Sequence, residues 1–460
     1  MNAPRARTVG GRLLGEWDRS VAVFRGVPFA APPVGALRWR PPQAAEGWDG
    51  ERRAIEFGPA PLQPQPPRGS VMYRTNFEDR RPLVMSEDCL YLNVWTSEPS
   101  PAAGLPVMVW IHGGGNRYGH GSQDIHDGAS LAARGLVVVT LNHRLGALGF
   151  LAHPGLAAED DLGASGNYGL LDLVAALTWV RENIAGFGGD PDRVTLAGNS
   201  AGAAHICHLM AATTARPFFR AALGQSASGV GRAEGPLPDQ EDAQKQGLSY
   251  ADEFATHDIE RLRGISGVEL VVRGHFGPVV DGRVLTEPTD DVFAAGRQHP
   301  VPLLVGTNLD EGTVYAKDGQ DPKTVGDTRF VRPVWQWAHT HRATTGAPTW
   351  MYRFTRRPAL PPGLPDSGVY HTAELPYVLD NLHRRPNWPW QPADHVLAGT
   401  MADTWARFVE SADPNGAWPQ NWPLFTGPDH TPAMIFGDTV GPGVLHRPTV
   451  PGARQPRTPT

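Results

Sequence analysis

The chain has 460 residues, of which 40% are hydrophobic, and a formal net charge of −6 at pH 7. A chain of this length and composition can bury a large core, because the fraction of surface that folding buries rises with length. The acidic balance leaves no basic patch of the size that a phosphate backbone requires, so we expect no nucleic-acid partner.

The sequence lacks the features of an exported or membrane-bound protein. No stretch approaches the ~18 continuous apolar residues that span a bilayer, which predicts no membrane segment. Residues 1–11 hold no apolar run that could form the core of a signal peptide. Two cysteines, Cys89 and Cys207, are too few for a disulfide framework. We therefore expect a cytoplasmic protein with two free thiols.

Along most of the chain, short apolar runs alternate with longer segments in which apolar residues recur at helical spacing. Apolar residues recur at helical spacing from Leu173 to Ile184, and the small residues 201–204 continue into a second helix. Buried parallel strands are apolar throughout, so the pattern predicts an α/β fold: a doubly wound, mostly parallel sheet with helices on both faces. The predicted strands are 107–111, 136–141, 194–197, 303–305, 350–354 and 434–436.

The later strands are predicted to extend the same sheet, and no linker-like segment separates them from the earlier ones. We therefore expect a single domain over residues 1–447, with long helical excursions. Residues 448–460 are rich in Pro, Thr and Arg and have nothing to bury, which predicts a disordered tail.

The strongest single motif is Gly198-Asn199-Ser200-Ala201-Gly202. It lies between a predicted strand and a small-residue helix, which is the context that a nucleophile elbow requires. At such a turn the serine hydroxyl is exposed, and the following helix directs its N-terminal amides to the same place. The alternative is a chance Gly-x-Ser-x-Gly in a glycine-rich chain, and the strand–helix context weighs against it.

A second glycine cluster, the His-Gly-Gly-Gly of residues 112–115, follows the strand predicted at 107–111. Consecutive glycines let a loop bring backbone amides close to a substrate, as in the oxyanion hole of hydrolases with a nucleophile elbow. The alternatives are a simple turn or a phosphate-binding loop. A phosphate loop requires Lys and Ser or Thr after its glycines, and Asn116-Arg117 follow here.

A nucleophilic serine needs a base, and 17 histidines leave the choice open on composition alone. In this fold the acid and then the histidine follow the nucleophile in the chain. His205 and His208 are too close to Ser200 on the same helix to reach back over the turn. His371 lies on a loop after the strand predicted at 350–354, which is the expected position.

The acid is expected at the end of the strand predicted at 303–305. Asp310-Glu311-Gly312 follows that strand on a loop. The pattern alone leaves Asp310 and Glu311 equal as candidates.

These motifs stand within a chain that resembles the type-B carboxylesterases, the family of the bacterial para-nitrobenzyl-type esterases and the cholinesterases. The likeness runs in collinear order from about residue 8 to residue 440. Besides the two glycine motifs, the blocks that carry it are 23–30 (Val-Phe-Arg-Gly-Val-Pro-Phe-Ala), 33–39 (Pro-Val-Gly-Ala-Leu-Arg-Trp), 86–94 (Ser-Glu-Asp-Cys-Leu-Tyr-Leu-Asn-Val), 141–146 (Leu-Asn-His-Arg-Leu-Gly), 166–172 (Gly-Asn-Tyr-Gly-Leu-Leu-Asp) and 187–191 (Phe-Gly-Gly-Asp-Pro).

The resemblance implies an α/β-hydrolase fold and a serine carboxylesterase that acts through an acyl-enzyme intermediate, on small or aryl esters of broad range. The family's Asp-Glu-Gly motif and its His before a Glu-Leu pair imply Glu311 as the acid and His371 as the base for Ser200. No metal or organic cofactor is implied. The amides of the oxyanion hole would be those of Gly114, Gly115 and Ala201.

The chain departs from the family pattern beside the nucleophile. Asn199 stands where the family usually has Glu, and Asn116, followed by Arg117, stands where it has an aromatic residue. If Asn116 and Arg117 reach the acyl pocket, the pocket is more polar than usual and favours acyl groups with an oxygen or a carboxylate. The alternative is that both side chains face solvent.

Glu311 and His371 are separated by 371 − 311 = 60 residues, fewer than the family commonly has. The blocks on either side are retained, which places the loss between about residues 313 and 327. Shorter helices there predict a wider entrance that tolerates bulky esters.

Other family features concern structure. The cysteine that usually pairs with Cys89 is replaced near Pro61, and Cys207 is expected to be a small core residue. The family also implies an ion pair between Arg38 and Glu87.

Three other functions compete with the esterase. An amidase or carbamate hydrolase, or a lipase, would use the same triad. A non-catalytic, cholinesterase-like binding module would lose the serine or the histidine, and both are present. We expect a small-molecule ester as substrate, and the sequence does not distinguish a monomer from a homodimer.

Overall fold

The computed structural model describes residues 2–416, 421–427 and 431–448. The tail predicted at 448–460 therefore lies outside the described residues, except for its first position.

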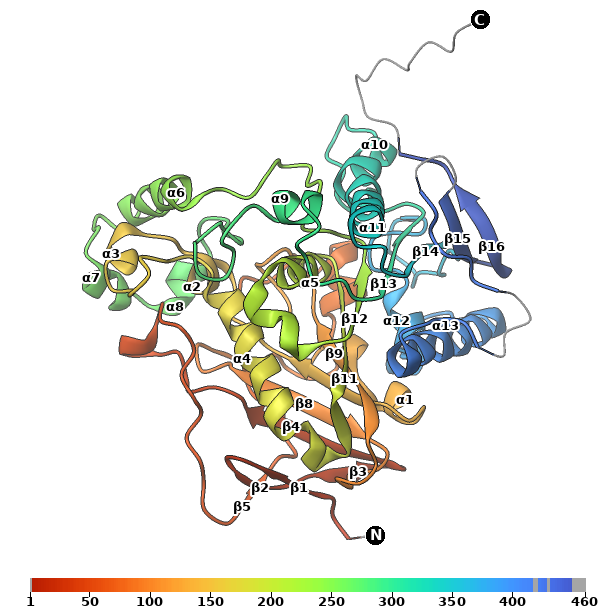
Figure 1. Ribbon diagram of the computed structural model, residues 1–460, viewed down its shortest axis with the longest axis horizontal. Coiled ribbons are helices and arrows are strands. Elements are labelled where there is room, and N and C mark those ends of the chain that lie inside the picture. The colour runs from red at the N-terminus through yellow and green to blue at the C-terminus, as the bar shows by residue number, and fades with distance from the viewer. Residues whose placement is uncertain (1, 417–420, 428–430, 449–460) are drawn as a thin grey trace, which may run out of the picture.

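A twisted central sheet runs through the described part of the chain (Figure 1). Its strand order is β16-β15-β14-β13-β12-β11-β9-β10-β8-β4-β3. The inner strands, from β10 to β15 in this order, are parallel, and antiparallel pairs close the sheet at both ends. The strands are β3 (Glu16–Asp18), β4 (Val21–Pro28), β8 (Tyr91–Thr96), β9 (Leu105–Ile111), β10 (Val137–Leu141), β11 (Gly189–Asn199), β12 (Ala221–Gln225), β13 (Leu303–Asn308), β14 (Thr349–Phe354), β15 (Thr431–Phe436) and β16 (Val440–Leu445).

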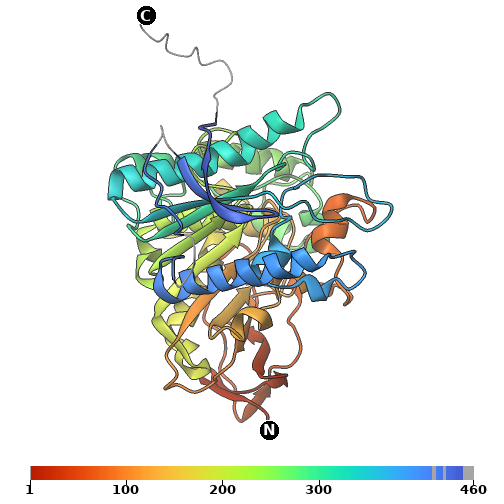
Figure 2. The ribbon, with the colours of Figure 1, turned by 90° about the vertical axis from the view of Figure 1, so that its right-hand side faces the viewer.

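Helices cover both faces of this sheet (Figure 2). The α-helices are α1 (Ala129–Ala132), α2 (Gly146–Phe150), α3 (Pro154–Ala157), α4 (Tyr168–Asn183), α5 (Ala201–Ala211), α6 (Gln240–Asp252), α7 (Ile259–Arg263), α8 (Gly267–Val271), α9 (Thr289–Ala294), α10 (Pro322–Gly326), α11 (Arg332–Thr345), α12 (Leu375–Val378) and α13 (Pro392–Ser411). Shorter helical turns are η1 (Gly35–Leu37), η2 (Tyr73–Phe77), η3 (Asp124–His126), η4 (Ile184–Phe187), η5 (Thr213–Phe218), η6 (Asp327–Val331) and η7 (Leu382–Arg384).

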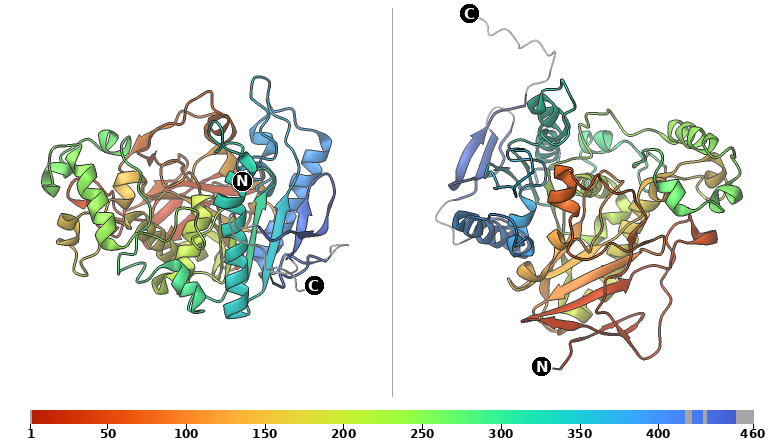
Figure 3. Two further views of the ribbon diagram at one scale, coloured as in Figure 1. Left: turned by 90° about the horizontal axis from the view of Figure 1, so that it is seen from above. Right: turned by 180° about the vertical axis from the view of Figure 1, so that it is seen from behind.

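Strand β9 shows why an apolar run becomes an inner strand. Successive side chains of a strand point to opposite faces, so a strand covered on both faces must be apolar at every position. Val109 and Ile111 join the core that includes α4, α5 and α11. Met108 and Trp110 join the core under α1, α12 and α13 on the opposite face. Each such side chain stabilises the fold by ~1.5–3 kcal/mol. Figure 3 shows the ribbon from above and from behind.

The predicted parallel strands all lie in this sheet, and the expected α/β-hydrolase architecture is confirmed. The helix expected over 173–184 is α4, which begins five residues earlier and gives way to η4 before Gly188, whose φ is 86°. The inner parallel strand β12 and the antiparallel strands β3, β4, β8 and β16 were not predicted. Two small separate sheets were also not predicted: one of β1 (Arg5–Thr8), β2 (Gly11–Leu14) and β5 (Glu51–Arg53), and one of β6 (Ala60–Pro61) and β7 (Met85–Ser86).

Two structural expectations from the family resemblance are confirmed. Arg38 and Glu87 form an ion pair with 2.6 Å between Nη2 and Oε1. Cys89 and Cys207 are free and buried, and burial raises the pKa of the Cys207 thiol to about 12, as expected for a core residue. No helix within the described ranges is long and apolar enough to cross a bilayer.

Candidate active site

Ser200 occupies the turn between β11 and α5. Its backbone has φ 52° and ψ −127°, a conformation that L-residues rarely adopt and that a sharp strand-to-helix turn imposes. The glycines on either side make the turn possible: a Cβ at Gly198 or Gly202 would lie 2.5 Å or 2.1 Å from the carbonyl oxygen of Ile111. The amide of Ser200 donates to the carbonyl of Gln225, 2.7 Å away, which fixes the turn to β12. The serine is thereby held at the carboxyl edge of the sheet.

Glu311 and His371 meet beside this turn. Glu311 follows β13, His371 lies on a loop after β14, and both are buried. The distance from His371 Nδ1 to Glu311 Oε2 is 2.6 Å. Glu311 Oε1 accepts a hydrogen bond from the hydroxyl of Ser226 at 2.6 Å and from the amide of Asn308 at 2.7 Å. The carboxylate is therefore fixed at both oxygens.

The neighbouring carboxylate has a different task. Asp310 Oδ2 accepts a hydrogen bond from the amide of Val369, 2.8 Å away, and so braces the loop that carries His371. Of the two acids that the sequence pattern left equal, Glu311 contacts the imidazole.

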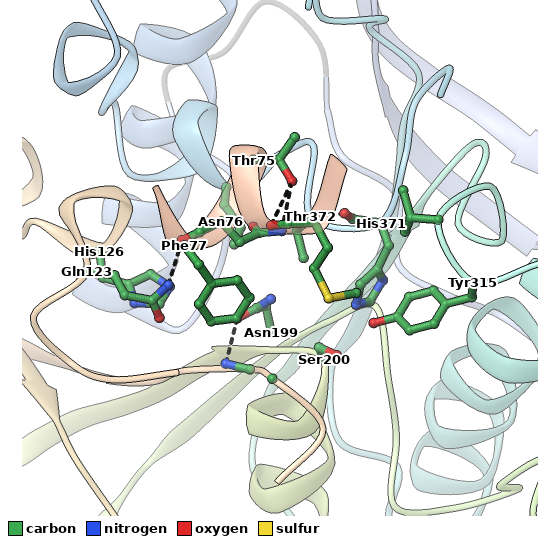
Figure 4. A pocket seen from close by; sticks show the side chains of 15 residues that line it. Thr75, Asn76, Phe77, Gln123, His126, Asn199, Ser200, Tyr315, His371 and Thr372 are labelled. Carbon is green, nitrogen blue, oxygen red and sulfur yellow. Dashed lines mark hydrogen bonds between the residues drawn. The ribbon is translucent and has the colours of Figure 1, made fainter. Parts of the chain in front are cut away.

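The second ring nitrogen of His371 faces the cavity that Ser200 lines (Figure 4). Nε2 is buried and has no hydrogen-bond partner among the described residues, so it can accept a proton from a group in the cavity. The rings of Phe330 and Tyr315 pack on the imidazole with centroids 4.4 and 5.2 Å away, which restricts its rotation. The Ser200 hydroxyl does not donate to His371 Nε2 in this structure. Catalytic hydrogen bonds are often long before substrate binds, so this arrangement is compatible with proton transfer from Ser200 to His371.

Tyr315 was not identified from the sequence. Its ring contacts His371, and its phenol lies close enough to Ser200 for the two hydroxyl groups to interact. Burial raises the pKa of Tyr315 to about 12, so the phenol keeps its proton at neutral pH and can donate a hydrogen bond.

A second buried carboxyl group lies near Glu311. Glu374 accepts hydrogen bonds from Asn308 Nδ2 and from Gln225 Nε2. Burial and the proximity of Glu311 both raise the pKa of Glu374. Two adjacent buried carboxylates repel each other when both are ionised, so ionisation of Glu374 is less favourable than that of an exposed glutamate.

The glycine loop of residues 113–115 passes beside the serine, since a Cβ at Gly113 would lie 2.9 Å from the Cβ of Ser200. Gly114 has φ 116°, and a Cβ there would lie 2.1 Å from the carbonyl oxygen of Tyr118, so only glycine fits. Asn199 Oδ1 accepts a hydrogen bond from the amide of Gly113 at 3.1 Å, which ties this loop to the elbow (Figure 4). The amides of Gly114, Gly115 and Ala201 donate to no group among the described residues.

Two cavities flank the serine. We call the first the His371 cavity: it measures about 40 Å³ and is lined by Ser200, His371, Gly114, Asn199, Phe77 and Tyr315 among others. Figure 4 shows Tyr315 and His371 on one side of it and Phe77 and Gln123 on the other. We call the second the Arg232 cavity: it measures about 390 Å³ and is lined by Gly115, Asn116, Ala201, His205, Arg232 and Phe330 among others.

Asn116 and Arg117, the two residues considered for the acyl pocket, point to different places in the structure. Asn116 lines the Arg232 cavity, and its Oδ1 is buried without a partner among the described residues. Arg117 turns toward the loop after α8: its Nη2 donates to the carbonyl of Val272 at 3.4 Å, and its guanidinium lies over the ring of Tyr118. His205 and His208 line the same cavity as Asn116, and His208 Nδ1 contacts the Thr289 hydroxyl.

The part of the chain that the structure describes contains no group of three or more His, Cys, Asp or Glu side chains that could hold a metal ion.

Comparison with known proteins points to one family. The carboxylesterase family model matches residues 2–325 and 322–440. The fumonisin B1 esterase of Sphingopyxis macrogoltabida is 35% identical over 482 residues, which cover 93% of this chain and 85% of that protein. The para-nitrobenzyl esterase of Bacillus subtilis is 32% identical over 464 residues, which cover 90% of this chain and 91% of that protein. A solved structure of a PNB esterase superimposes with a TM-score of 0.84 at 30% identity, covering 96% of this chain and 97% of that one.

Proposed function

The chain belongs to the type-B carboxylesterase family and is a carboxylic ester hydrolase, and from that premise we propose that Ser200 is its nucleophile, His371 its general base and Glu311 the acid that orients the base. The observation that carries this proposal is the 2.6 Å contact between His371 Nδ1 and Glu311, with Nε2 of the same ring turned to the cavity of Ser200.

The reaction follows from these positions. His371 Nε2 takes the proton of Ser200 as Oγ attacks the ester carbonyl carbon, and Glu311 stabilises the imidazolium that forms. The amides of Gly114, Gly115 and Ala201 donate to the carbonyl oxygen as it becomes an oxyanion. His371 then protonates the departing alkoxide, which leaves an acyl group on the serine. A water molecule, deprotonated by His371, releases the acid and restores the serine.

The two cavities receive different halves of the substrate. His371 must reach the leaving oxygen to protonate it, so the alcohol half lies in the His371 cavity. The carbonyl oxygen points to the amides, and the acyl chain then extends past Gly115 and Ala201 into the Arg232 cavity.

The test is burst-phase hydrolysis of 4-nitrophenyl acetate and butyrate by wild type and Ser200→Ala. We expect a burst of one nitrophenol per chain in wild type, and a loss of ~10³-fold or more in the mutant because the acyl-enzyme route is gone. Ser411→Ala, at the exposed end of α13, is the control and should behave as wild type. Steady hydrolysis by Ser200→Ala at the wild-type rate would contradict the proposal.

The same assay separates the competing functions. An amidase would cleave 4-nitroanilides at rates near those of the esters, and a lipase would be activated above the solubility limit of its substrate. The relatives named for fumonisin B1, for para-nitrobenzyl esters and, in Homo sapiens, for cocaine give three further esters to include.

Two expectations about the whole chain remain proposals. A single domain is supported by the sheet itself, because β3 and β16, from opposite ends of the chain, close its two edges. Limited proteolysis that released a stable fragment would contradict it. A cytoplasmic location is supported by the two free thiols and is tested by cell fractionation.

A further inference from the structure

The Arg232 cavity has the size of a ligand site and a charged lining. Its volume of about 390 Å³ falls within the roughly 300–1,000 Å³ of small-molecule pockets. The charged residues among those that line it are Arg232, Glu234 and Arg329. Glu234 and Arg329 are both about half exposed and lie 3.7 Å apart, so they form a pair near solvent.

Arg232 is the charge that has no partner. Its Nη1 is buried without a hydrogen-bond partner, and it forms no ion pair within the described residues. Burial lowers the pKa of its guanidinium, and Glu234 and Asp290 offset this only through space. A guanidinium remains charged in proteins, so the buried Nη1 of Arg232 is a hydrogen-bond donor without an acceptor.

The backbone holds Arg232 in place. The amide of Gly231 donates to Asp290 Oδ1 at 2.9 Å, and a Cβ at Gly231, where φ is 65°, would lie 2.4 Å from Gln336 Oε1. The preceding Val230 is buried in the core, and its amide donates to the Ser228 hydroxyl. The guanidinium therefore extends from a fixed loop that also carries Ser226, the partner of Glu311.

Two further polar side chains of this cavity lack partners. Both ring nitrogens of His205 are buried without a hydrogen bond among the described residues, and the ring is held flat against Phe150. Burial lowers the pKa of His205 to about 3, so the ring is neutral at pH 7 and offers one N–H. Asn116 likewise has a buried amide oxygen without a partner, and its own carbonyl accepts from the amide of Gly146.

Buried polar groups in folded proteins are almost always hydrogen-bonded, so several unpaired ones around one cavity indicate a polar ligand. Asn116 lies next to Gly115, an amide of the oxyanion hole, while Arg232 contributes a positive charge elsewhere in the lining of the same cavity. Resting on the function proposed above, we propose that the Arg232 cavity binds acyl groups that end in a second carboxylate, with Arg232 as the residue that selects them. The preferred substrates are half-esters of dicarboxylic acids, and the products are a free alcohol and a dicarboxylate.

A carboxylate fits this lining better than a larger polyanion. The planar guanidinium matches the two oxygens of a carboxylate, and the neutral N–H of His205 can donate to a polar group along the acyl chain, while Asn116 Oδ1 can accept from one. Glu234, which lines the same cavity, disfavours anions of higher charge. The enzyme would then accept a broad range of alcohol groups, as expected from the sequence, but only a restricted set of acyl groups.

The test compares two esters with the same leaving group: the 4-nitrophenyl half-ester of glutaric acid and 4-nitrophenyl valerate. Wild type should show a higher kcat/KM for the half-ester. Arg232→Gln should lower kcat/KM for the half-ester by roughly 10- to 100-fold, the range of a charge-assisted hydrogen bond, and change it for valerate by less than about threefold. Arg261→Gln removes the same charge from the exposed face of α7 and should leave the ratio of the two esters unchanged.

Equal kcat/KM for the two esters in wild type, with Ser200-dependent hydrolysis of valerate, would overturn this inference and leave the proposed function standing. Binding supplies a readout without turnover: by calorimetry, glutarate should bind Ser200→Ala at least tenfold more tightly than Ser200→Ala/Arg232→Gln. Equal affinities would overturn the inference whatever the activity. Partial recovery of half-ester preference in Arg232→Lys would support a role for the charge itself.

Discussion

The two cavities beside the turn of Ser200 differ in the charge of the side chains that line them. None of the described residues that line the His371 cavity is Asp, Glu, Lys or Arg, and its lining includes the apolar side chains of Phe77 and Leu375. The Arg232 cavity has both a partly buried arginine and an exposed ion pair in its lining. Phe330 stands between them, since it lines the Arg232 cavity and packs on His371.

This difference in charge suggests that the residues that break the ester bond are distinct from those that select the substrate. In the proposed mechanism the ester bond is broken where Ser200, His371 and the amides meet, and that centre is the same for every ester. The alcohol half meets mainly uncharged surface, which discriminates weakly, because one methylene more or less in an apolar pocket changes binding by only ~1–3 kcal/mol. The acyl half meets unpaired polar groups, which discriminate strongly. Changes at the centre should therefore affect all esters alike, and changes in one cavity should affect one half of the substrate.

The largest effect is expected from Glu311→Gln. An amide in place of the carboxylate disturbs the hydrogen bond that fixes the tautomer of His371, and kcat should fall ~10³- to 10⁴-fold. The fall should be equal for the glutaric half-ester and for valerate, because neither cavity is touched. Asp310→Asn, which keeps an acceptor for the amide of Val369, is the matched control and should lose only a few-fold. Unequal losses for the two esters would show that the centre and the acyl cavity are coupled.

A smaller effect is expected from Phe77→Ala in the His371 cavity. The ring lies at the end of η2, packs on Tyr118 with centroids 5.9 Å apart and faces the cavity in Figure 4. Losing it should lower kcat/KM for 4-nitrophenyl esters ~10-fold relative to ethyl esters of the same acid, since an aromatic contact contributes ~1–1.5 kcal/mol. The preference for the glutaric acyl group should be retained. A loss of acyl preference with no change between alcohols would reverse our assignment of the two cavities.

The sequence predicted those parts of the molecule that local patterns determine. An apolar run made the inner strands β9 and β13 readable, whereas the inner strand β12, with the sequence Ala-Ala-Leu-Gly-Gln, was missed because its apolar run is short. Edge strands such as β3 and β16 have mixed burial and no such run. Ser200 and the glycine loop were predicted because their motifs include the strand and the turn that position them. The choice between Asp310 and Glu311 required the family resemblance, since both follow the same strand.

The rest of the site depends on contacts between distant loops. Arg232 and His205 come to one cavity because the loop after β12 folds over α5, and no spacing in the sequence encodes that approach. Tyr315 and Ser226 were missed for the same reason, although both follow strands at the carboxyl edge of the sheet, where ligands of α/β folds bind. The widened entrance expected from the short 313–327 segment stays a prediction. In the structure this segment packs closely on the loop of the acid, since a Cβ at Gly312 would lie 1.9 Å from the carbonyl oxygen of Pro322.

The smallest effect concerns stability in acid. Burial lowers the pKa of His143, His205 and His208 to about 3 each. Because the folded pKa lies below the ordinary 6.5, the unfolded chain binds protons first as the pH falls, and the free energy of unfolding decreases between about pH 6.5 and pH 3. Each histidine contributes a slope of at most ~1.4 kcal/mol per pH unit. His205→Asn should reduce the slope by up to that amount in urea unfolding at pH 4 to 6. If the neutral ring of His205 donates to the acyl group, glutarate should stabilise wild type more than His205→Asn at pH 7. Equal stabilisation would show that His205 contributes only to core packing. Arg232 alone would then distinguish the two cavities.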